Sequence, residues 1–223
     1  MDMFKRGLAF LMLLSPLFVN AQTFETGGLL AANYQMQILE GWHWNARAEF
    51  RFDGNFTHYD RLRVGAGTEY SFWEKRIKVG VSYDYLNYHI EHSFENRHRV
   101  TAALTWTEKW GGCKLSYRAA FQSTFYDERR AECSYNPKIY MRNRLSFVYQ
   151  IPEKPLKLHA SEEFWLRLNH PDRKIVDDLR TIVGVEYAIN KRHSLDLYLR
   201  SDNEVLVPDP KNIFYLGITY SFD

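Results

Sequence analysis

Arginines recur two residues apart at the start of several apolar segments. Three copies begin at Arg61, Arg97 and Arg142, each continuing as arginine, any residue, arginine and an apolar residue, and Asp178-Leu179-Arg180 is a weaker fourth copy. Side chains two apart on a β-strand point to the same face. Guanidinium groups gathered on one face bind carboxylates and phosphates through paired hydrogen bonds. These residues therefore predict either an anion-binding surface or a set of internal ion pairs.

A second group of candidate catalytic residues is His159, Ser161 and Glu163, which lie two residues apart on one expected strand. Nucleophilic hydrolysis needs a base beside the serine and an acid that orients the base. The spacing resembles that of outer-membrane phospholipases, which present the serine toward lipid. Here Leu158 and Ala160 mark the apolar face, so the polar residues are expected to point inward. We therefore predict that the protein is not an enzyme, and the alternative is an outer-membrane lipid hydrolase using Ser161 and His159.

Other residues with ligand chemistry do not form a recognisable site. His89 and His92 flank Glu91, but no third ligand is spaced to complete a metal site. The sequence contains no phosphate-binding loop, no dinucleotide fingerprint and no nucleic-acid motif. We therefore predict no cofactor, no metal and no nucleic-acid partner.

The elements that position these residues follow one pattern, in which apolar and polar residues alternate over stretches of about ten residues. It is clearest at 214–222, where apolar residues occupy every second position. The alternation predicts eleven strand-like segments, at 26–38, 42–53, 60–72, 76–88, 96–107, 113–126, 138–151, 155–168, 177–190, 193–202 and 211–222. Such segments fit an all-β fold, an antiparallel up-and-down transmembrane β-barrel with an apolar outside and a polar inside.

The strand count and the orientation follow from the connections. Short turns alternate with longer loops near 54–59, 89–95, 127–137, 169–176 and 203–210. Outer-membrane barrels have short periplasmic turns and longer outer loops, so this rhythm predicts a periplasmic C-terminus. Bacterial barrels usually have an even number of strands. We therefore expect ten to twelve strands, with twelve as the best estimate if 22–38 holds two short strands.

A soluble barrel with the same alternation would turn its apolar residues inward, and alternation alone does not separate the two folds. Aromatic residues at the short-turn ends of the strands favour the membrane, because such residues gather at bilayer interfaces. These rim aromatics are Trp42, Trp44, Phe72, Trp106, Tyr149, Tyr187, Tyr220 and Phe222. We predict a monomeric barrel in the outer membrane of a Gram-negative bacterium, in contact with outer-membrane lipid.

The first residues are typical of a secretory signal. Lys5 and Arg6 precede an apolar stretch at 7–19, and Val19-Asn20-Ala21 is a small-residue cleavage site. The stretch is too short for a spanning helix, which needs about 20 residues. We therefore expect a cleavable signal peptide at 1–21 and a barrel at 22–223. Cys113 and Cys133 are expected at opposite rims, too far apart for a disulfide, and so to be free thiols.

Together these features resemble a known family. The signal, the alternation of short turns and long loops, the paired arginines and the ending Tyr215 to Phe222 are similar to Bacteroidota outer-membrane proteins. More narrowly, the chain resembles the family called domain of unknown function 2490. That resemblance implies a fold and a location, but no activity. C-terminal strands that the barrel-assembly machinery recognises usually end on an aromatic residue, and here Asp223 follows Phe222. We expect that machinery to be a partner through the strand ending at Phe222.

The charged face must line the lumen, because charges on a lipid face are costly. The arginines in the long-loop half of the strands predict a cationic belt, formed by Arg51, Arg61, Arg63, Arg97, Arg99, Arg142, Arg144 and Arg180. One interpretation is a small, anion-preferring pore, porin-like, that attracts a small anionic solute. The other is a structural or binding barrel, plugged or gated, whose arginines pair with Glu49, Asp53, Asp84, Glu163 and Glu186. Barrel size slightly favours the second interpretation.

Overall fold

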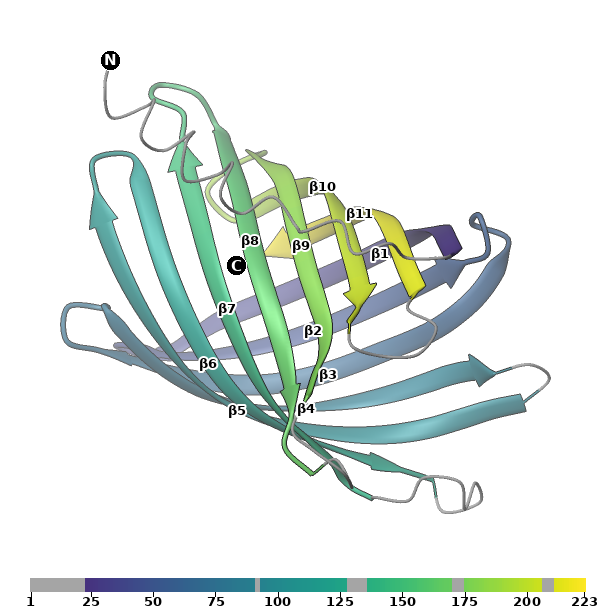
Figure 1. The fold of residues 1–223 in the computed structure, drawn as a ribbon. Coiled ribbons are helices and arrows are strands. Elements are labelled where there is room, and N and C mark those ends of the chain that lie inside the picture. Colours follow the sequence, from purple (N-terminus) through teal and green to yellow (C-terminus); the bar gives the residue numbers. More distant parts are fainter. Residues whose placement is uncertain (1–22, 91–92, 128–135, 170–174, 206–210) are drawn as a thin grey trace.

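The computed structural model describes residues 23–90, 93–127, 136–169, 175–205 and 211–223. Eleven strands close into a single barrel in which neighbours in sequence are neighbours in space (Figure 1). Their bounds are β1 Thr23–Leu39, β2 Trp42–Asp53, β3 His58–Phe72, β4 Ile77–Ile90, β5 Ser93–Trp110, β6 Cys113–Tyr126, β7 Lys138–Gln150, β8 Leu156–Arg167, β9 Ile175–Ala188, β10 His193–Glu204 and β11 Lys211–Phe222. The predicted all-β barrel and most of its strand limits are confirmed.

The strand count of eleven lies within the predicted range and one below the best estimate of twelve. The segment expected to hold two short strands is one strand of 17 residues, β1. With an odd number of strands, the first and last run in the same direction. The barrel therefore closes through a parallel pair, in which Thr23 lies opposite Lys211 and Tyr34 opposite Phe222, while the other neighbouring strands are antiparallel.

The connections define two ends of the barrel. We call the end with the connections at 40–41, 73–76, 111–112, 151–155 and 189–192 the short-turn rim, and the opposite end the long-loop rim. The loop expected at 89–95 is shorter than predicted, because β4 and β5 continue pairing as far as Ile90 and Ser93. The two-residue turn at 40–41 uses Gly41, whose φ of 75° favours glycine.

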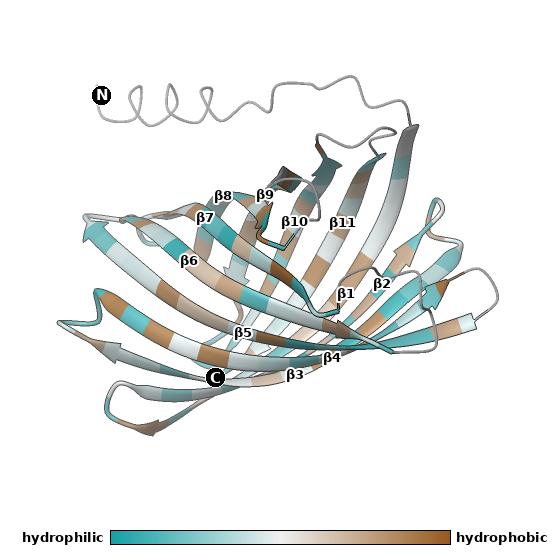
Figure 2. Cartoon of the chain, turned by 60° about the horizontal axis from the view of Figure 1, so that its bottom comes forward, coloured by the Kyte–Doolittle hydropathy of each residue, from teal (hydrophilic) through white to brown (hydrophobic). Residues whose placement is uncertain are grey.

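Burial in this barrel is the reverse of burial in a soluble one. The side chains with the least exposure include Glu49, Asp84 and Glu163 at 2–3%. By contrast, apolar side chains such as Leu104, Leu197 and Leu199 are 51–65% exposed. Figure 2 shows hydrophobic and hydrophilic residues alternating along the strands. The charged face thus lines the inside, as the sequence predicted, and the arrangement expected of a soluble barrel is not found.

The predicted rim aromatics lie on the outer face at the short-turn ends of their strands. Trp42, Trp44, Trp106 and Tyr187 are 43–54% exposed. Among the residues described, no helix is long and apolar enough to cross a membrane. Cys113, at the start of β6, is a free thiol. Cys133 and the predicted signal peptide at 1–21 lie outside the described residues.

Candidate functional site in the barrel lumen

The long-loop half of the lumen is filled by arginine and aromatic side chains. Tyr88, Trp165 and Tyr215 point inward, and each ring lies within 5.4 Å of two guanidinium carbons. Cation–π contacts of this kind are attractive and pack the flat guanidinium group against the ring. We call this layer the plug, formed by Arg61, Tyr88 and Arg97, by Arg142, Trp165 and Arg180, and by Arg51, Tyr215 and Arg200.

Glu163 and Asp202 bind the arginines of two groups of the plug, and Asp202 connects these two groups. Glu163 on β8 lies 2.7 Å from Arg142 Nη2 and 3.6 Å from Arg180 Nη1. Asp202 on β10 lies 2.7 Å from Arg180 Nε and also pairs with Arg200. Since these carboxylates are shared between strands, they hold neighbouring arginines in fixed positions and offset their mutual repulsion.

Glu49 continues the same network on the opposite side of the closing strands. Its Oε1 accepts a hydrogen bond from Arg51 Nη2 at 2.7 Å, and its Oε2 accepts from Arg47 Nη2 at 2.8 Å. Arg63 on β3 pairs with Asp84 at 2.8 Å and lies 4.0 Å from Glu49. The ion pairs therefore extend from β2 and β3 to β4, and through Arg51 and Asp202 to β10.

The structure places all eight belt arginines inside the barrel, and six of them have a carboxylate within 4.0 Å. Arg99 and Arg144 have none among the described residues, and the Nε atom of each is buried without a hydrogen-bond partner there. Of the predicted carboxylate partners, Glu49, Asp84 and Glu163 pair with arginines. The other two expectations are wrong: Glu186 pairs with Lys157 at 2.6 Å, and Asp53 has no ion pair within the described part of the chain.

Asp202 is the functional carboxylate that sequence reasoning missed. It lies two residues after Arg200 on β10 and therefore shares its inward face. Arg200 and Asp202 repeat the two-residue spacing of the arginine pairs, but the second residue is negatively charged. The spacing therefore indicates that both side chains lie on the same face. The strand predicted at 193–202 ends at Asp202 itself, whereas the observed strand continues to Glu204.

Two glycines make room for inward side chains where the wall is crowded. A Cβ on Gly217 would lie 2.3 Å from the ring of Tyr198 on the neighbouring strand. A Cβ on Gly184 would lie 2.5 Å from His159 Nε2 and 2.6 Å from Tyr198 Cβ. Glycine at both positions therefore lets the Tyr198 ring lie against β11 and the His159 ring against β9.

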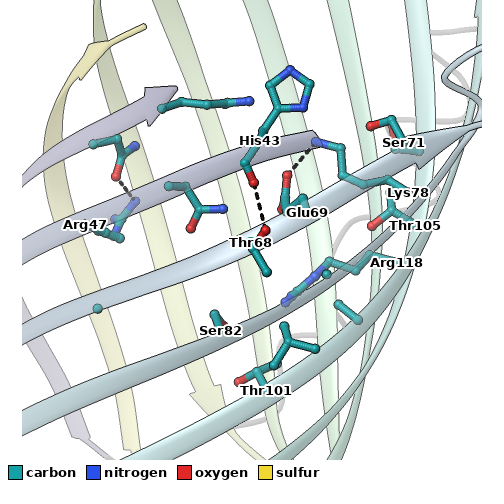
Figure 3. Close-up of a pocket in the computed structure, with 18 of the residues that line it drawn as sticks. His43, Arg47, Thr68, Glu69, Ser71, Lys78, Ser82, Thr101, Thr105 and Arg118 are labelled. Carbon is teal, nitrogen blue, oxygen red and sulfur yellow. Dashed lines mark hydrogen bonds and ion pairs between the residues drawn. The ribbon is translucent and has the colours of Figure 1, made fainter. Parts of the chain in front are cut away.

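The short-turn half of the lumen is hollow. A cavity of about 670 Å³ lies between the plug and the short-turn rim, and its wall comes mainly from β1 to β7. Figure 3 shows His43, Thr68, Glu69 and Lys78 on this wall. Small polar side chains, including Ser82, Thr101, Thr105, Ser116 and Ser146, cover much of the rest. We call this space the chamber.

Positive charge dominates the chamber wall. Its cations are Arg47, Arg63, Arg118, Arg144, Lys75, Lys78, Lys109 and Lys114, against the carboxylates Glu69, Asp84 and Asp223. Lys78 is neutralised by Glu69 at 2.8 Å, and Arg63 by Asp84. By contrast, Lys114 has no carboxylate within 4.0 Å among the described residues.

Two arginines lie side by side where the chamber meets the plug. Arg118 on β6 and Arg144 on β7 are direct cross-strand partners that share the inward face. The nearest carboxylate in an ion pair with Arg118 is Glu163 at 3.6 Å, and that carboxylate already binds Arg142 and Arg180. Like charges directly opposite each other are destabilising, and an anion between them removes that cost. This pair is the strongest candidate binding site in the described structure.

The residues of the hydrolase alternative all face the lumen. His159 Nε2 lies 2.7 Å from Asp196 Oδ1, so the carboxylate that orients the histidine is Asp196. Glu163 belongs to the plug. No hydrogen bond joins Ser161 to His159 in the described structure, and an activated serine needs a base within about 3.2 Å.

The fold and the lumen define a class of protein, a closed and mostly antiparallel β-barrel with an apolar exterior and a charged interior. Within that class, residues 26–205 match the family model described as Protein of unknown function (DUF2490), so the chain belongs to that family. This confirms the resemblance seen in the sequence, although the match does not test the Bacteroidota origin. A search of curated proteins finds no match.

Proposed function

We propose that this protein is an outer-membrane β-barrel that binds a small anionic solute in the chamber, with the plug acting as a gate. The side-by-side Arg118 and Arg144 carry the proposal, because they form an incompletely neutralised cationic site in a space large enough for a small molecule. Pores selective for anions and phosphates are lined by arginine and lysine in the same way.

The exterior supports the membrane location. Apolar side chains cover the outward positions of the strands, and aromatic residues mark the short-turn rim. In this arrangement the short-turn rim and the C-terminus face the periplasm, and the chamber lies on the periplasmic side. The strand ending at Phe222 is the segment offered to the barrel-assembly machinery. Outer-membrane lipid surrounds the wall, and no cofactor, metal or nucleic acid is needed.

The plug is the feature that distinguishes a permanently open pore from a gated or binding barrel. Its arginines are held by carboxylates on β8 and β10, and their guanidinium groups pack against the aromatic rings. We therefore favour a closed resting state, in which an anion reaches Arg118 and Arg144 from the short-turn rim and does not pass to the other side.

The test combines binding and conductance on the refolded protein. Inorganic phosphate is titrated into the protein in phosphatidylcholine vesicles permeabilised to the ion, and single-channel current is recorded in a planar bilayer under a salt gradient. We expect saturable phosphate binding that requires Arg118 and Arg144, together with a silent or rarely opening channel. Steady anion-selective steps in the current would show an open pore and refute the gate. Phosphate binding that is unchanged in Arg144→Gln would refute the binding site.

A lipid acyl hydrolase using Ser161 and His159 remains the alternative function. The pairing of His159 with Asp196 supplies an oriented histidine, but the serine lies on the lumen face, away from lipid. Phospholipid hydrolysis that is lost in Ser161→Ala and retained in Arg144→Gln would establish that function in place of the one proposed.

A further inference from the structure

A second pair of like charges lies in the chamber, close to the short-turn rim. Lys109 on β5 and Lys114 on β6 are direct cross-strand partners, and both line the chamber. Neither lysine has an ion pair among the residues that the structure describes. Like charges directly opposite each other are destabilising, and a bound anion removes that cost. We call these two lysines the rim pair.

Strand β6 fixes the distance between the rim pair and the arginine pair. Lys114 and Arg118 are four residues apart on β6 and share its inward face, so their Cα atoms lie about 13 Å apart at about 3.3 Å per residue. A single phosphate ion therefore reaches only one of the two pairs. A ligand that neutralises both pairs needs two anionic groups, and the chamber, at about 670 Å³, has the volume of a small-molecule site.

Hydroxyl groups cover the wall between the two cationic pairs. Ser116, midway between Lys114 and Arg118 on β6, is the cross-strand partner of Thr107 on β5 and of Ser146 on β7. The Oγ1 of Thr107 and the Oγ of Ser116 share one hydrogen bond at 3.0 Å, whereas Ser146 has no side-chain hydrogen bond among the described residues. Because hydroxyl groups both donate and accept hydrogen bonds, this row favours a ligand with hydroxyl groups in its middle.

The carboxylates of the chamber wall lie away from this surface. Glu69 binds Lys78 and Asp84 binds Arg63, in both cases between β3 and β4. Asp223 follows the end of β11. Among the described residues that line the chamber, β5, β6 and β7 contribute no carboxylate. This part of the wall is therefore cationic at both ends and carries neutral hydroxyl groups between them.

We propose that the chamber binds an elongated dianion, a polyol or short sugar with an acidic group at each end. One acidic group binds between Arg118 and Arg144, whose guanidinium groups suit the paired oxygens of a phosphate or carboxylate. The other binds the rim pair, whose ammonium groups act as point charges. The inference rests on the proposed function, because the inner end of the ligand occupies the same arginine site.

The test compares three probes by calorimetric titration of the full-length protein in phosphatidylcholine nanodiscs, where both rims are accessible. Mannitol phosphorylated at both ends carries two charged groups and the hydroxyl groups between them. Mannitol phosphorylated at one end lacks the second charged group, and hexanediol phosphorylated at both ends lacks the hydroxyl groups. We expect mannitol bisphosphate to bind at least about tenfold more tightly than mannitol monophosphate, and about threefold or more tightly than hexanediol bisphosphate.

Variants of the rim pair test where the second charged group binds. Lys114→Gln removes the charge but keeps a polar side chain, and should reduce the affinity ratio of mannitol bisphosphate to mannitol monophosphate to about threefold or less. Lys109→Gln should act in the same direction. Lys191→Gln, at the short-turn rim outside the chamber, is the control and should leave the ratio unchanged. A wild-type ratio near one, or a ratio that neither chamber variant lowers, overturns the inference.

The hydroxyl row has its own test. Ser146→Ala should abolish the preference for mannitol bisphosphate over hexanediol bisphosphate, and a preference that persists in both Ser146→Ala and Ser116→Ala overturns the polyol assignment.

Failure of this inference differs from failure of the proposed function. Mannitol monophosphate that binds through Arg144, with no gain from a second phosphate, overturns the elongated ligand alone. Binding of either phosphate that does not depend on Arg144 overturns the arginine site as well.

Discussion

The two halves of the lumen are built from the same strands, yet one is filled and the other is hollow. On β5 the inward residues change from Glu95, Arg97 and Arg99 near the long-loop rim to Thr101, Ala103 and Thr105 near the other end. On β4 they change from Tyr88 and Leu86 to Ser82 and Gly80. Side-chain volume at inward positions, as well as strand number, therefore decides where a barrel of this size is open.

The two halves also differ in how their charges are satisfied. In the plug, carboxylates such as Glu163 and Asp202 are each shared by more than one arginine. In the chamber, Arg144 and Lys114 have no carboxylate within 4.0 Å among the described residues. Each arginine of the plug therefore has a carboxylate partner, whereas the described part of the chamber contains cations without one.

Removing the carboxylate of Glu163, which binds two arginines of the plug, should reduce the free energy of unfolding most. Glu163→Ala leaves Arg142 and Arg180 without their shared partner, and breaking a buried ion pair costs about 3–5 kcal/mol. Urea unfolding in vesicles, followed by the mobility shift of the folded barrel on gels, measures the loss. Glu163→Gln, which keeps hydrogen-bonding capacity, should lose less. Glu153→Ala, in an exposed turn, is the control, and a loss equal to that of Glu163→Ala would contradict the distinction.

Removing an aromatic ring should make the filled half resemble the hollow one. Trp165→Ala takes away the ring that packs against Arg142 and Arg180, and we expect a stability loss of about 3 kcal/mol and anion-selective conductance. Planar-bilayer recording measures the conductance. The matched variant Trp106→Ala removes a tryptophan from the outer face and should leave the current unchanged. A Trp165→Ala barrel as silent as the wild type would show that this ring does not close the lumen.

In the chamber, loss of one guanidinium group should change binding more than stability. Arg144→Gln removes a charge-assisted hydrogen bond to the anion, worth about 1.5–3 kcal/mol, and so should weaken phosphate binding by roughly 10- to 150-fold. Removing one of two adjacent cations should leave the unfolding midpoint unchanged or raise it. Calorimetric titration of vesicle-embedded protein measures the affinity. Lys191→Gln, at the short-turn rim outside the chamber, serves as the control, and an equal effect there would indicate nonspecific attraction.

The smallest effect is expected at the rim. Arg76 lies 3.4 Å from Glu108, and the Arg76 side chain is 46% exposed. Exposed ion pairs contribute about 0–1 kcal/mol because water and salt screen them. Arg76→Gln should therefore change unfolding in urea by less than about 1 kcal/mol, and less still in high salt. A loss of stability as large as that of Glu163→Ala would contradict the expected difference between ion pairs at the rim and in the plug.

Much of the fold was predictable because period-two alternation fixes the face of every residue at once. The inward direction of Arg63, Arg99 and Arg144 followed from it, as did the outward direction of Trp42 and Trp106. The strand count was harder to predict, because the pattern gives the length of β1 but not whether it is divided. Alternation gives the face of a residue but not which inward side chains fill the lumen. It therefore could not distinguish the plug from the chamber.

The ion pairs were predictable only in part, for a physical reason. Pairing on a sheet depends on register, and register depends on bulges and on loop length. Glu163 and Asp84 face arginines in the observed register, whereas Glu186 lies opposite Lys157 and Asp196. Glu162 shows the same limit, because two adjacent glutamates leave the face of each ambiguous until the strand register is known.

The parallel closure of β1 and β11 determines how this chain can be rearranged. β1 begins at the long-loop rim opposite Lys211, and β11 ends at the short-turn rim opposite Tyr34. The start of one strand and the end of the other are therefore separated by about 35–40 Å, the length of a strand of this size. A short linker cannot join them, so circular permutation of this barrel requires a linker that spans its full height. Reporter tags fused to the two ends would, for the same reason, lie at opposite rims of the barrel.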